Sequence, residues 1–577
     1  MDRTSIIAVA VAVAVLFGWE FWYAPKMYKQ QAAQHAVSPG PVESPQPPPS
    51  GPAPSFQSAK PLAAAEPSVK ETIVKAASAS VEYEFTNIGG GIERVVLLQH
   101  EAEQGGHVML NEFGSVPIGA ISTQAGEGTN VGYTVTQSSG AVVCERTAPD
   151  GLRVVKKFTL PTETSGAKEF IVNLDVTFEN TAPQPYRAPA YYVYVGSAAK
   201  IHQRDLPTYT AFDWYAGKVT ETSVMWFDAG RIPLLGIQTS AAKDRYEASA
   251  KEITWVGVKS QYFTTMLTPL DDKGEPSSQG QTVWARRFPL PDEPKEPKLY
   301  GIEGALAMPG FELKPGETHE EHFQIYSGPK DYRLLKQLGD AQSGIMNFGM
   351  FKIVSIFLLK MMNTLKGVLG SFAAAIIVMT FIIRGAMWPL QNKANQSMKR
   401  MQALQPKMTE LREKYKDDPT KMNTELMKLY RDYGASPFAG CLPMFVQIPV
   451  FFGFYAMLGT AIELRGSHFL WVTDLSQPDT VAHIAGFPLN ILPLCMAATM
   501  LVQMQLTPKS GDKMQQRIFM FVPLIFISFC YNFASALALY WTVQNLFSIV
   551  QLYITKNQPV PALKKIASPN DKKRGKR

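Results

Sequence analysis

The chain has 577 residues, of which 46% are hydrophobic and 18% are charged, and its formal net charge is +7. This length accommodates several domains, while the four cysteines are too few for a disulfide framework. The GxxxxGK(S/T), HExxH and GxSxG motifs and a paired-cysteine zinc spacing are all absent from the sequence, so we expect no enzyme, no cofactor and no metal site.

The chain opens with an apolar run over residues 6–19, followed by aromatic residues up to Tyr23. Such a run is either a cleaved signal peptide or a retained membrane anchor. The aromatic residues are typical of a membrane interface, and the nearest pairs of small residues lie far beyond the run. We therefore favour a retained transmembrane anchor over residues 1–24.

Two very different regions follow the anchor. Residues 25–71 are rich in Pro, Ala and Ser and lack the apolar residues of a core, so they are expected to form a disordered linker. Residues 72–340 contain short alternating runs such as EFIVNLDVTFEN, separated by Gly, Pro and Asn, which predict an antiparallel β-sandwich domain. The three glycines at 89–91 are predicted to form a hairpin turn, because no helical pattern follows them.

The remaining chain alternates between apolar and basic segments. Residues 345–367 have an amphipathic pattern that suits a helix in the membrane interface, although they could also simply extend the following span. The expected transmembrane helices are near 369–390, 438–462, 487–506, 518–532 and 534–555. A helical hairpin is expected over 391–437, with Asp418 as N-cap, Pro419 in the first turn and Gly434 as a C-terminal stop.

Basic residues set the expected orientation, because cytoplasmic loops of membrane proteins collect Lys and Arg. Residues 391–437 carry ten basic and six acidic side chains, and residues 556–577 carry eight and one. The loop 463–486 has one arginine and three acids. We therefore expect both termini and the hairpin in the cytoplasm, and the region 25–345 outside it.

One charged residue lies inside an expected span. Arg384 is six residues from the end of its span at 390, or about 9 Å deep, and its nearest acidic neighbour on the C-terminal side is Glu410. Polar residues recur in the other spans, so together they could line a hydrated cavity in the cytoplasmic half of the membrane. The polar positions are Thr380, Gln447, Cys495, Thr499, Gln503, Tyr540, Gln544, Ser548 and Gln551, beside Trp541 and Asn545. Alternatively, Arg384 snorkels to lipid phosphates and the other residues form hydrogen bonds between helices.

Several segments resemble the YidC/Oxa membrane protein insertases. They are FIIRGAMWPL, LQPKMTELREKY, GCLPMFVQIPVFFGFYAML with IELR, MQQRIFMFVPLIF and ALALYWTVQNLFSIVQ, in matching order over about residues 345–556. The resemblance implies a multi-pass α-helical inner-membrane protein of the Gram-negative type. Such a protein has six transmembrane helices, five of which form the insertase bundle (368–556), and a periplasmic all-β domain, called a β-supersandwich.

The resemblance also implies function. A positively charged hydrophilic groove, open to cytoplasm and lipid, would receive the polar part of a client and let its apolar part slide into lipid. The groove residues would be Arg384, Thr380, Gln447, Tyr540, Trp541, Gln544, Thr499 and Gln503. The hairpin that receives the incoming chain includes Pro406, Lys407, Arg412 and Tyr415.

Partners follow from the resemblance and from the charge of the tail. The clients would be nascent integral membrane proteins, inserted and chaperoned alone or with the Sec translocon. The basic cytoplasmic tail 557–577 could bind ribosomal RNA, or anionic phospholipids, or remain solvated. No small-molecule substrate is expected. The rival function is a small-solute or ion transporter built around Arg384, but transporters usually show internal repeats, and none is visible in the sequence.

Overall fold

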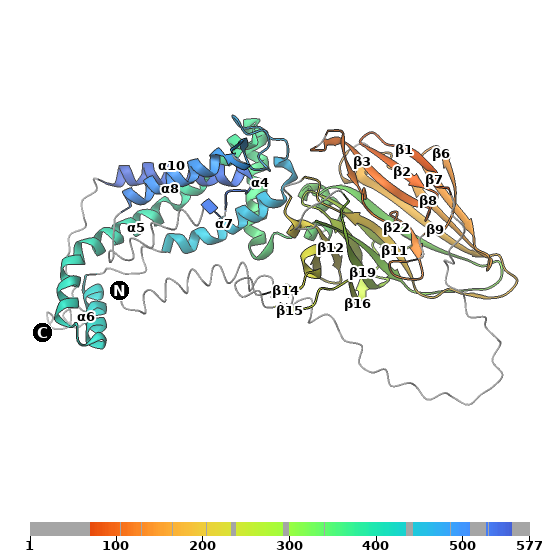
Figure 1. Cartoon of the computed structure of the whole chain (residues 1–577), viewed down its shortest axis with the longest axis horizontal. Helices are drawn as coiled ribbons and strands as arrows, with labels where there is room; N and C mark the ends of the chain where they lie inside the picture. Colours follow the sequence, from red (N-terminus) through yellow and green to blue (C-terminus); the bar gives the residue numbers. More distant parts are fainter. Residues whose placement is uncertain are drawn as a thin grey trace, which may run out of the picture. The chain divides into compact units, whose positions relative to one another are not determined.

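The structure is a computed structural model that describes residues 70–556, except 104, 128–129, 164, 203–204, 232–237, 292–298, 340, 434–441, 485, 508–526 and 529. The expected anchor, the tail 557–577, nearly all of the linker and most of the expected span 518–532 lie outside the described residues. The described chain forms two compact units, a β-rich one that ends at Met346 and a helical one that begins at Asn347 (Figure 1).

The β-rich unit is built from antiparallel sheets. The largest has nine strands, in the order β13 (Val219–Ser223), β12 (Ala211–Tyr215), β17 (Trp255–Lys259), β18 (Phe263–Leu270), β22 (Thr318–Pro329), β9 (Ile171–Asn180), β8 (Leu152–Thr159), β7 (Ala141–Thr147) and β6 (Thr134–Ser138). A five-stranded sheet packs on it through β11 and β20, in the order β16 (Arg245–Ile253), β19 (Gly280–Pro289), β20 (Tyr300–Met308), β11 (Tyr191–Ala198) and β5 (Ile121–Ser122).

A third sheet and small ribbons complete this unit. The third sheet has the order β1 (Ile73–Ala77), β2 (Val81–Thr86), β3 (Gly91–Glu101) and β4 (His107–Leu110). The ribbons pair β10 (Tyr186–Arg187) with β21 (Glu312–Leu313), and β14 (Gly230–Arg231) with β15 (Gln238–Ser240). A short helix, α3 (Tyr332–Leu338), follows β22 and is N-capped by the Asp331 carboxylate.

The alternation in the sequence explains these sheets. In β9, Val172, Leu174, Val176 and Phe178 are all buried, while the residues between them are more exposed, as expected for a strand with one face on a core. The prediction of a mostly β-sheet domain is therefore confirmed. The predicted glycine turn is also confirmed, because β2 and β3 pair as a hairpin and Gly89 and Gly90 have φ of 74° and 56°.

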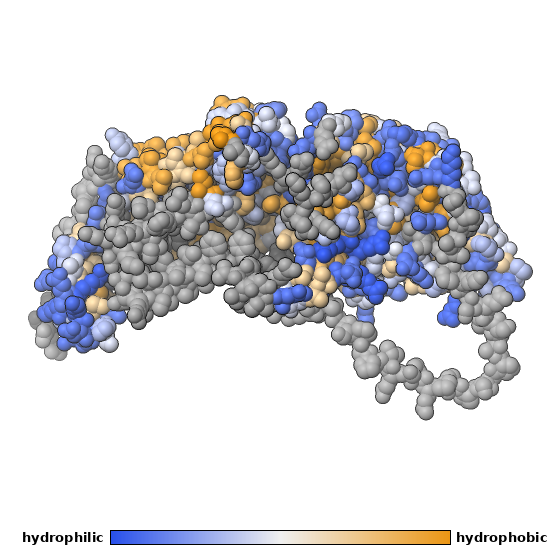
Figure 2. All heavy atoms as spheres, in the orientation of Figure 1, coloured by the Kyte–Doolittle hydropathy of each residue, from blue (hydrophilic) through white to orange (hydrophobic). Residues whose placement is uncertain are grey.

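The helical unit contains α4 (Lys352–Leu369), α5 (Phe372–Lys414), α6 (Pro419–Asp432), α7 (Leu442–Thr460), α8 (Ile491–Leu506) and α10 (Ser535–Lys556). A ribbon of β23 (Thr480–Ile484) and β24 (Phe487–Asn490) lies between α7 and α8 in the chain. Among the described residues, α5 and α10 are long and apolar enough to cross a membrane, whereas α7 and α8 provide shorter apolar stretches. The expected total of six transmembrane helices therefore stays a prediction. Figure 2 shows hydrophobic surface over α8 and α10 and mostly hydrophilic surface at the α6 end.

The helix boundaries have local causes. Gly370, with φ of 74°, ends α4, and its amide donates to the Lys366 carbonyl. Ser371 then caps α5 by accepting a hydrogen bond from the Ala374 amide, so α4 and α5 are separate helices. At α6 the predicted N-cap is confirmed, since the Asp418 side chain accepts from the Lys421 amide and Pro419 is the first residue.

The helix α5 is longer than the expected span. It continues without a break past residue 390, where the sequence suggested a boundary between span and hairpin, and it contains Pro389 and Pro406. Its last part packs against α6, with Leu404 and Met408 buried against Leu426, and α6 lies beside the far end of α5 (Figure 1).

Candidate functional site

Polar side chains from several apolar helices meet in the interior of the helical unit. On α10, Tyr540, Gln544, Ser548 and Gln551 are spaced by four, four and three residues and are each at most 8% exposed. This spacing keeps them on one face of the helix. The polar stripe of α10 therefore points into the protein rather than toward lipid.

Gln447 connects this stripe to α7. Its side-chain amide nitrogen donates to the Tyr540 hydroxyl at 2.9 Å and to the Gln544 Oε1 at 3.1 Å. The Gln447 Oε1 is buried and has no hydrogen-bond partner in the described part of the chain. Three of the predicted groove residues thus form one hydrogen-bonded group that still has a free acceptor.

Arg384 lies near the same group, on α5. It is within electrostatic range of Tyr540, and its Nε is buried without a hydrogen-bond partner among the described residues. Thr380, one turn earlier, is fully buried, but its hydroxyl donates to the Ile376 carbonyl at 2.7 Å. Thr380 is therefore buried one turn from Arg384, and its hydroxyl proton is donated within α5.

Thr499 and Gln503 belong to α8, which packs along α10. The Thr499 hydroxyl accepts from the Asn545 side-chain amide at 3.1 Å, and the same amide donates to the Met496 carbonyl at 3.3 Å. The Gln503 Oε1 is buried without a partner in the described chain. Asn545 was not among the predicted groove residues, although its position next to Gln544 in the sequence could have indicated it.

The two aromatic residues of α10 differ in their surroundings. Tyr540 is 1% exposed and stacks on Phe454 with 4.1 Å between ring centroids. Trp541 is half-buried and contacts Phe451 edge-on, with 4.9 Å between centroids. Trp541 is thus the more accessible of the two side chains.

A second group of unpartnered polar atoms lies further along α5 and α10. Asn392 Oδ1, Asn395 Nδ2, Arg400 Nε and Gln551 Nε2 are all buried and lack hydrogen-bond partners within the described ranges. The Lys399 ammonium donates to the Thr555 carbonyl at 2.7 Å, which ties the two helices together there. Asn392, Asn395 and Arg400 were not predicted, because the residues after 390 were expected to form a hairpin in the cytoplasm.

The predicted hairpin residues are not brought to the Arg384 region. Pro406, Lys407 and Arg412 are exposed on α5, and Lys407 is 23 residues, or roughly 35 Å, beyond Arg384 on one helix. The Lys407 ammonium donates to the Tyr433 hydroxyl at 2.7 Å. Tyr415 follows α5, with Lys421 Nζ 5.4 Å from its ring centroid.

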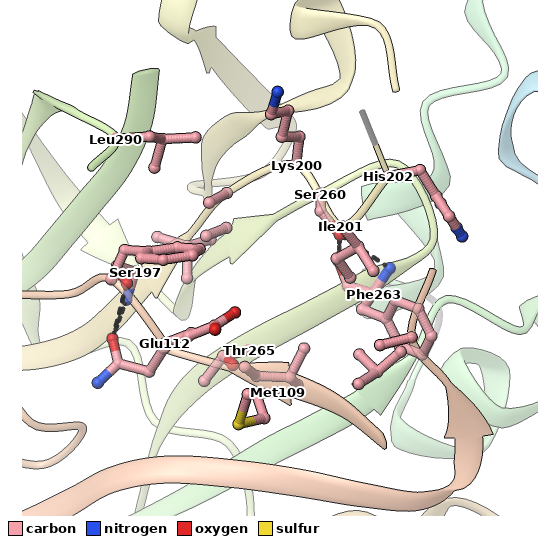
Figure 3. Close-up of a pocket in the computed structure, with 18 of the residues that line it drawn as sticks. Met109, Glu112, Ser197, Lys200, Ile201, His202, Ser260, Phe263, Thr265 and Leu290 are labelled. Carbon is pink, nitrogen blue, oxygen red and sulfur yellow. Dashed lines mark hydrogen bonds between the residues drawn. The ribbon is translucent and has the colours of Figure 1, made fainter. Parts of the chain in front are cut away.

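The β-rich unit contains a separate cavity of about 450 Å³ that was not predicted. Glu112, Lys200, His202 and Phe263 are among its lining residues (Figure 3). Burial raises the pKa of the Glu112 carboxyl. In the described part of the chain, no three His, Cys, Asp or Glu side chains are grouped as metal ligands.

Comparisons with known proteins cover nearly the whole chain. The family model described as "60Kd inner membrane protein" matches residues 364–562, and the model described as "YidC periplasmic domain" matches residues 74–361. The membrane protein insertase YidC of Pelobacter propionicus is 30% identical over 578 residues, which cover 96% of this chain and 99% of the relative. That of Geobacter metallireducens is 29% identical with the same coverage. A crystal structure of an active YidC insertase, with its first transmembrane domain resolved, matches with a TM-score of 0.34 and 18% identity, over 86% of this chain and 94% of the other.

Proposed function

This chain belongs to the YidC family of membrane protein insertases, and from that premise we propose that the polar residues around Arg384 form the groove through which it inserts its clients. It is an inner-membrane protein with a mostly β-sheet periplasmic domain, and its clients are nascent membrane proteins.

One observation carries the proposal. Arg384 Nε, Gln447 Oε1 and Gln503 Oε1 are buried, polar and without partners among the described residues. A buried polar group without a partner costs about 1–3 kcal/mol. These polar atoms are therefore suited to form hydrogen bonds with molecules that bind only transiently, such as water or a segment of the client.

The energetics of insertion fit such a groove. A charged side chain at the bilayer centre costs about 2.5–3.5 kcal/mol on insertion-based scales. Polar groups and water in the cytoplasmic half of the membrane lower this cost for the polar tail of a client. The apolar segment of the client then leaves along the lipid-exposed side of α5 and α7, driven by the transfer of its apolar surface out of water.

Arg384 is the groove's source of positive charge. It attracts acidic tails of clients without a fixed carboxylate partner of its own. Tyr540 and Gln544 hold Gln447 in place from α10, while Trp541, which is more accessible, is the aromatic residue proposed to contact the client. The hairpin of α5 and α6 receives the incoming chain through Pro406, Lys407, Arg412 and Tyr415.

We propose that the protein has six transmembrane helices, including the anchor 1–24, with both termini in the cytoplasm. The Sec translocon is the proposed partner for larger clients, and the basic tail 557–577 is the proposed contact with ribosomal RNA or anionic phospholipids. A small-solute transporter is less well supported, because the sequence has no internal repeat and the named relatives are insertases.

The test uses the purified protein in liposomes with a single-span client that carries an acidic tail. Protease protection of the tail reports its translocation. We expect Arg384→Ala to reduce translocation about tenfold and Arg384→Lys to retain most of it, since the positive charge is kept. Leu546→Ala is the control, because Leu546 is 49% exposed on α10, outside the proposed path of the client along α5 and α7.

The outcomes separate the possibilities. Equal translocation by wild type and Arg384→Ala would leave the insertase function in place but make Arg384 a snorkelling anchor. If wild type performs no better than empty liposomes, then the protein needs partners for this client. Loss of activity in the Leu546→Ala control would mean that the assay reports general damage to the helical unit.

A further inference from the structure

The segment between α7 and α8 exposes apolar side chains on two separate turns, and we propose that it is a lipid-binding element that inserts these turns into the bilayer interface. This goes beyond the proposed groove and does not depend on Arg384. In the proposed topology, the leaflet concerned is the periplasmic one.

The first observation is the exposure of large apolar side chains. Leu470 is 77% exposed, Phe487 76% and Ile484 62%, and Trp471 and Val481 are each more than 40% exposed. Large apolar side chains that are exposed close together along one segment often mark an interaction site. Leucine, isoleucine and aromatic side chains are well suited to the boundary between lipid headgroups and acyl chains.

The second observation is the backbone that presents them. Phe469 and Val472 form an isolated antiparallel bridge that places Leu470 and Trp471 at the tip of a tight turn. Leu470 has a φ of 51°, a left-handed conformation that is uncommon for a residue with a bulky side chain. The other turn joins β23 to β24, where Ile484 pairs with Phe487 at the end of the ribbon. A strained position that is occupied by leucine rather than glycine or asparagine indicates that the side chain is used.

The third observation is that the base of the segment is fixed by polar contacts. The Asp479 carboxylate, 4% exposed, accepts from the Trp471 indole nitrogen at 3.0 Å and from the Leu492 amide, at the start of α8, at 2.6 Å. The Tyr531 hydroxyl donates to the Pro488 carbonyl at 2.7 Å, and the Ser535 amide donates to the Gln477 carbonyl at 2.8 Å. These contacts hold the turns in place from below, so the apolar tips cannot easily fold back onto their own base.

Continuity with the helix surface identifies lipid as the occupant. The strand β24 leads directly into α8. In this helix the exposed apolar residues Leu501 and Val502 lie seven and eight residues after the exposed Leu494, and so on the same side of the helix. Between Gly466 and Asn490 the only acidic or basic residues besides histidine are Asp474 and the buried Asp479. The tips therefore carry no fixed charge that would select a charged protein partner.

The test places a photoreactive benzophenone amino acid at Leu470, Ile484 or Phe487 in the full-length protein, reconstituted in phosphatidylcholine liposomes. We expect lipid adducts at all three positions, detected by mass spectrometry. Thr473, which is exposed but polar and lies in the same segment, is the matched negative control. Leu501, on the exposed face of α8, is the positive control.

Adducts at the tips at least fivefold above those at Thr473 would support the proposal. Adducts to the β-rich unit or to a second copy of the chain in place of lipid would overturn it, and so would an absence of adducts at the tips when Leu501 reacts. Yields should agree within about twofold when phosphatidylglycerol replaces a third of the phosphatidylcholine, because the tips are uncharged. A requirement for the anionic lipid would also contradict insertion by apolar side chains. Since the readout is cross-linking rather than insertion of a client, its failure leaves the proposed function standing.

Discussion

Gln447 joins two side chains of α10 through one amide group, while its own carbonyl oxygen stays without a partner in the described chain. At the scale of single residues, this combination leaves a buried acceptor available at an interface that is otherwise hydrogen-bonded. A purely structural hydrogen bond between helices satisfies both of its partners. The region is therefore held together and still has unused hydrogen-bonding capacity.

Replacing Gln447 should affect both stability and activity. Gln447→Leu removes the hydrogen bonds to Tyr540 and Gln544 and leaves those groups buried, which should lower the free energy of unfolding by about 1–3 kcal/mol. We expect client translocation to fall roughly threefold to tenfold as well. Thermal unfolding in detergent and the liposome assay measure the two effects.

Tyr540→Phe provides the comparison for that experiment. It removes one hydrogen bond of Gln447 but keeps the ring that stacks on Phe454, so its effects should be smaller than those of Gln447→Leu. If Tyr540→Phe lowers stability and translocation more than Gln447→Leu does, then the Tyr540 hydroxyl has the main role instead.

In the β-rich unit, a buried lysine makes stability depend on pH. Lys156 is fully buried, and its ammonium donates to the Gly89 and Gly119 carbonyls at 2.6 and 3.1 Å. Burial lowers the pKa of Lys156 from 10.5 to about 7. Between these values the unfolded chain binds the proton and the folded chain does not, so stability rises with pH from 7 toward 10.5 and is lost as pH falls toward 7.

The expected size of this effect is up to about 1.4 kcal/mol per pH unit. Unfolding of the β-rich unit by urea, followed by circular dichroism between pH 7 and 9, measures it. In Lys156→Met the contribution of Lys156 to the change in unfolding free energy with pH should disappear. If the slope is the same in the variant, another group is responsible.

At the scale of elements, the contact between α4 and α7 depends on a glycine. The Ser355 hydroxyl donates to the Gly453 carbonyl at 3.0 Å, and a Cβ atom at Gly453 would lie 2.8 Å from a methyl group of Val354. Gly453→Ala should therefore push α4 away from α7 and lower the free energy of unfolding by about 1–3 kcal/mol.

A second substitution tests the cause. Val354→Ala removes the methyl group that the new Cβ would meet, so the double variant should recover most of the stability lost in Gly453→Ala. Thermal unfolding of both variants and of Val354→Ala alone measures the coupling. If the stability losses of the two single variants simply add in the double variant, then the contact of the new Cβ with Val354 is not the cause of the loss.

Helices and strands could be predicted from the sequence where the residues that determine them lie within a few positions of each other. The strands and the α6 N-cap were predictable because alternation, Asp418 and Pro419 act within a few residues. The continuation of α5 past 390 was not, because hydropathy indicates where apolar residues end, whereas Gln, Lys and Met extend a helix equally well in water. The pairing of Thr499 with Asn545 was also missed, since it depends on how α8 and α10 are rotated against each other.

At the scale of the whole molecule, the division into two compact units predicts two separate unfolding transitions. The β-rich unit can be selectively destabilised through Lys259, which is 3% exposed. Its ammonium lies 2.6 Å from carboxylate oxygens of both Asp213 and Glu221. Lys259→Met removes the ammonium from this buried ion-pair group and should cost the β-rich unit about 3–5 kcal/mol.

Calorimetry of the full chain in detergent tests this division. We expect Lys259→Met to lower the midpoint of one transition and leave the other within about 1 °C, because a substitution in one compact unit does not change the packing of the other. Adding Asp213→Leu should restore part of the loss, because the fully buried carboxylate that Lys259 contacted is then gone. A single transition that shifts as a whole would mean that the units unfold together.

The unbroken course of α5 has a mechanical consequence. With 43 residues it is about 65 Å long, and it contains both Arg384 and the hairpin residue Lys407. No loop separates these two residues, so we expect a tilt of α6 and of the end of α5 to move the part of α5 that contains Arg384. Pro389 and Pro406 each remove one backbone hydrogen bond, and at these two points the helix bends most easily.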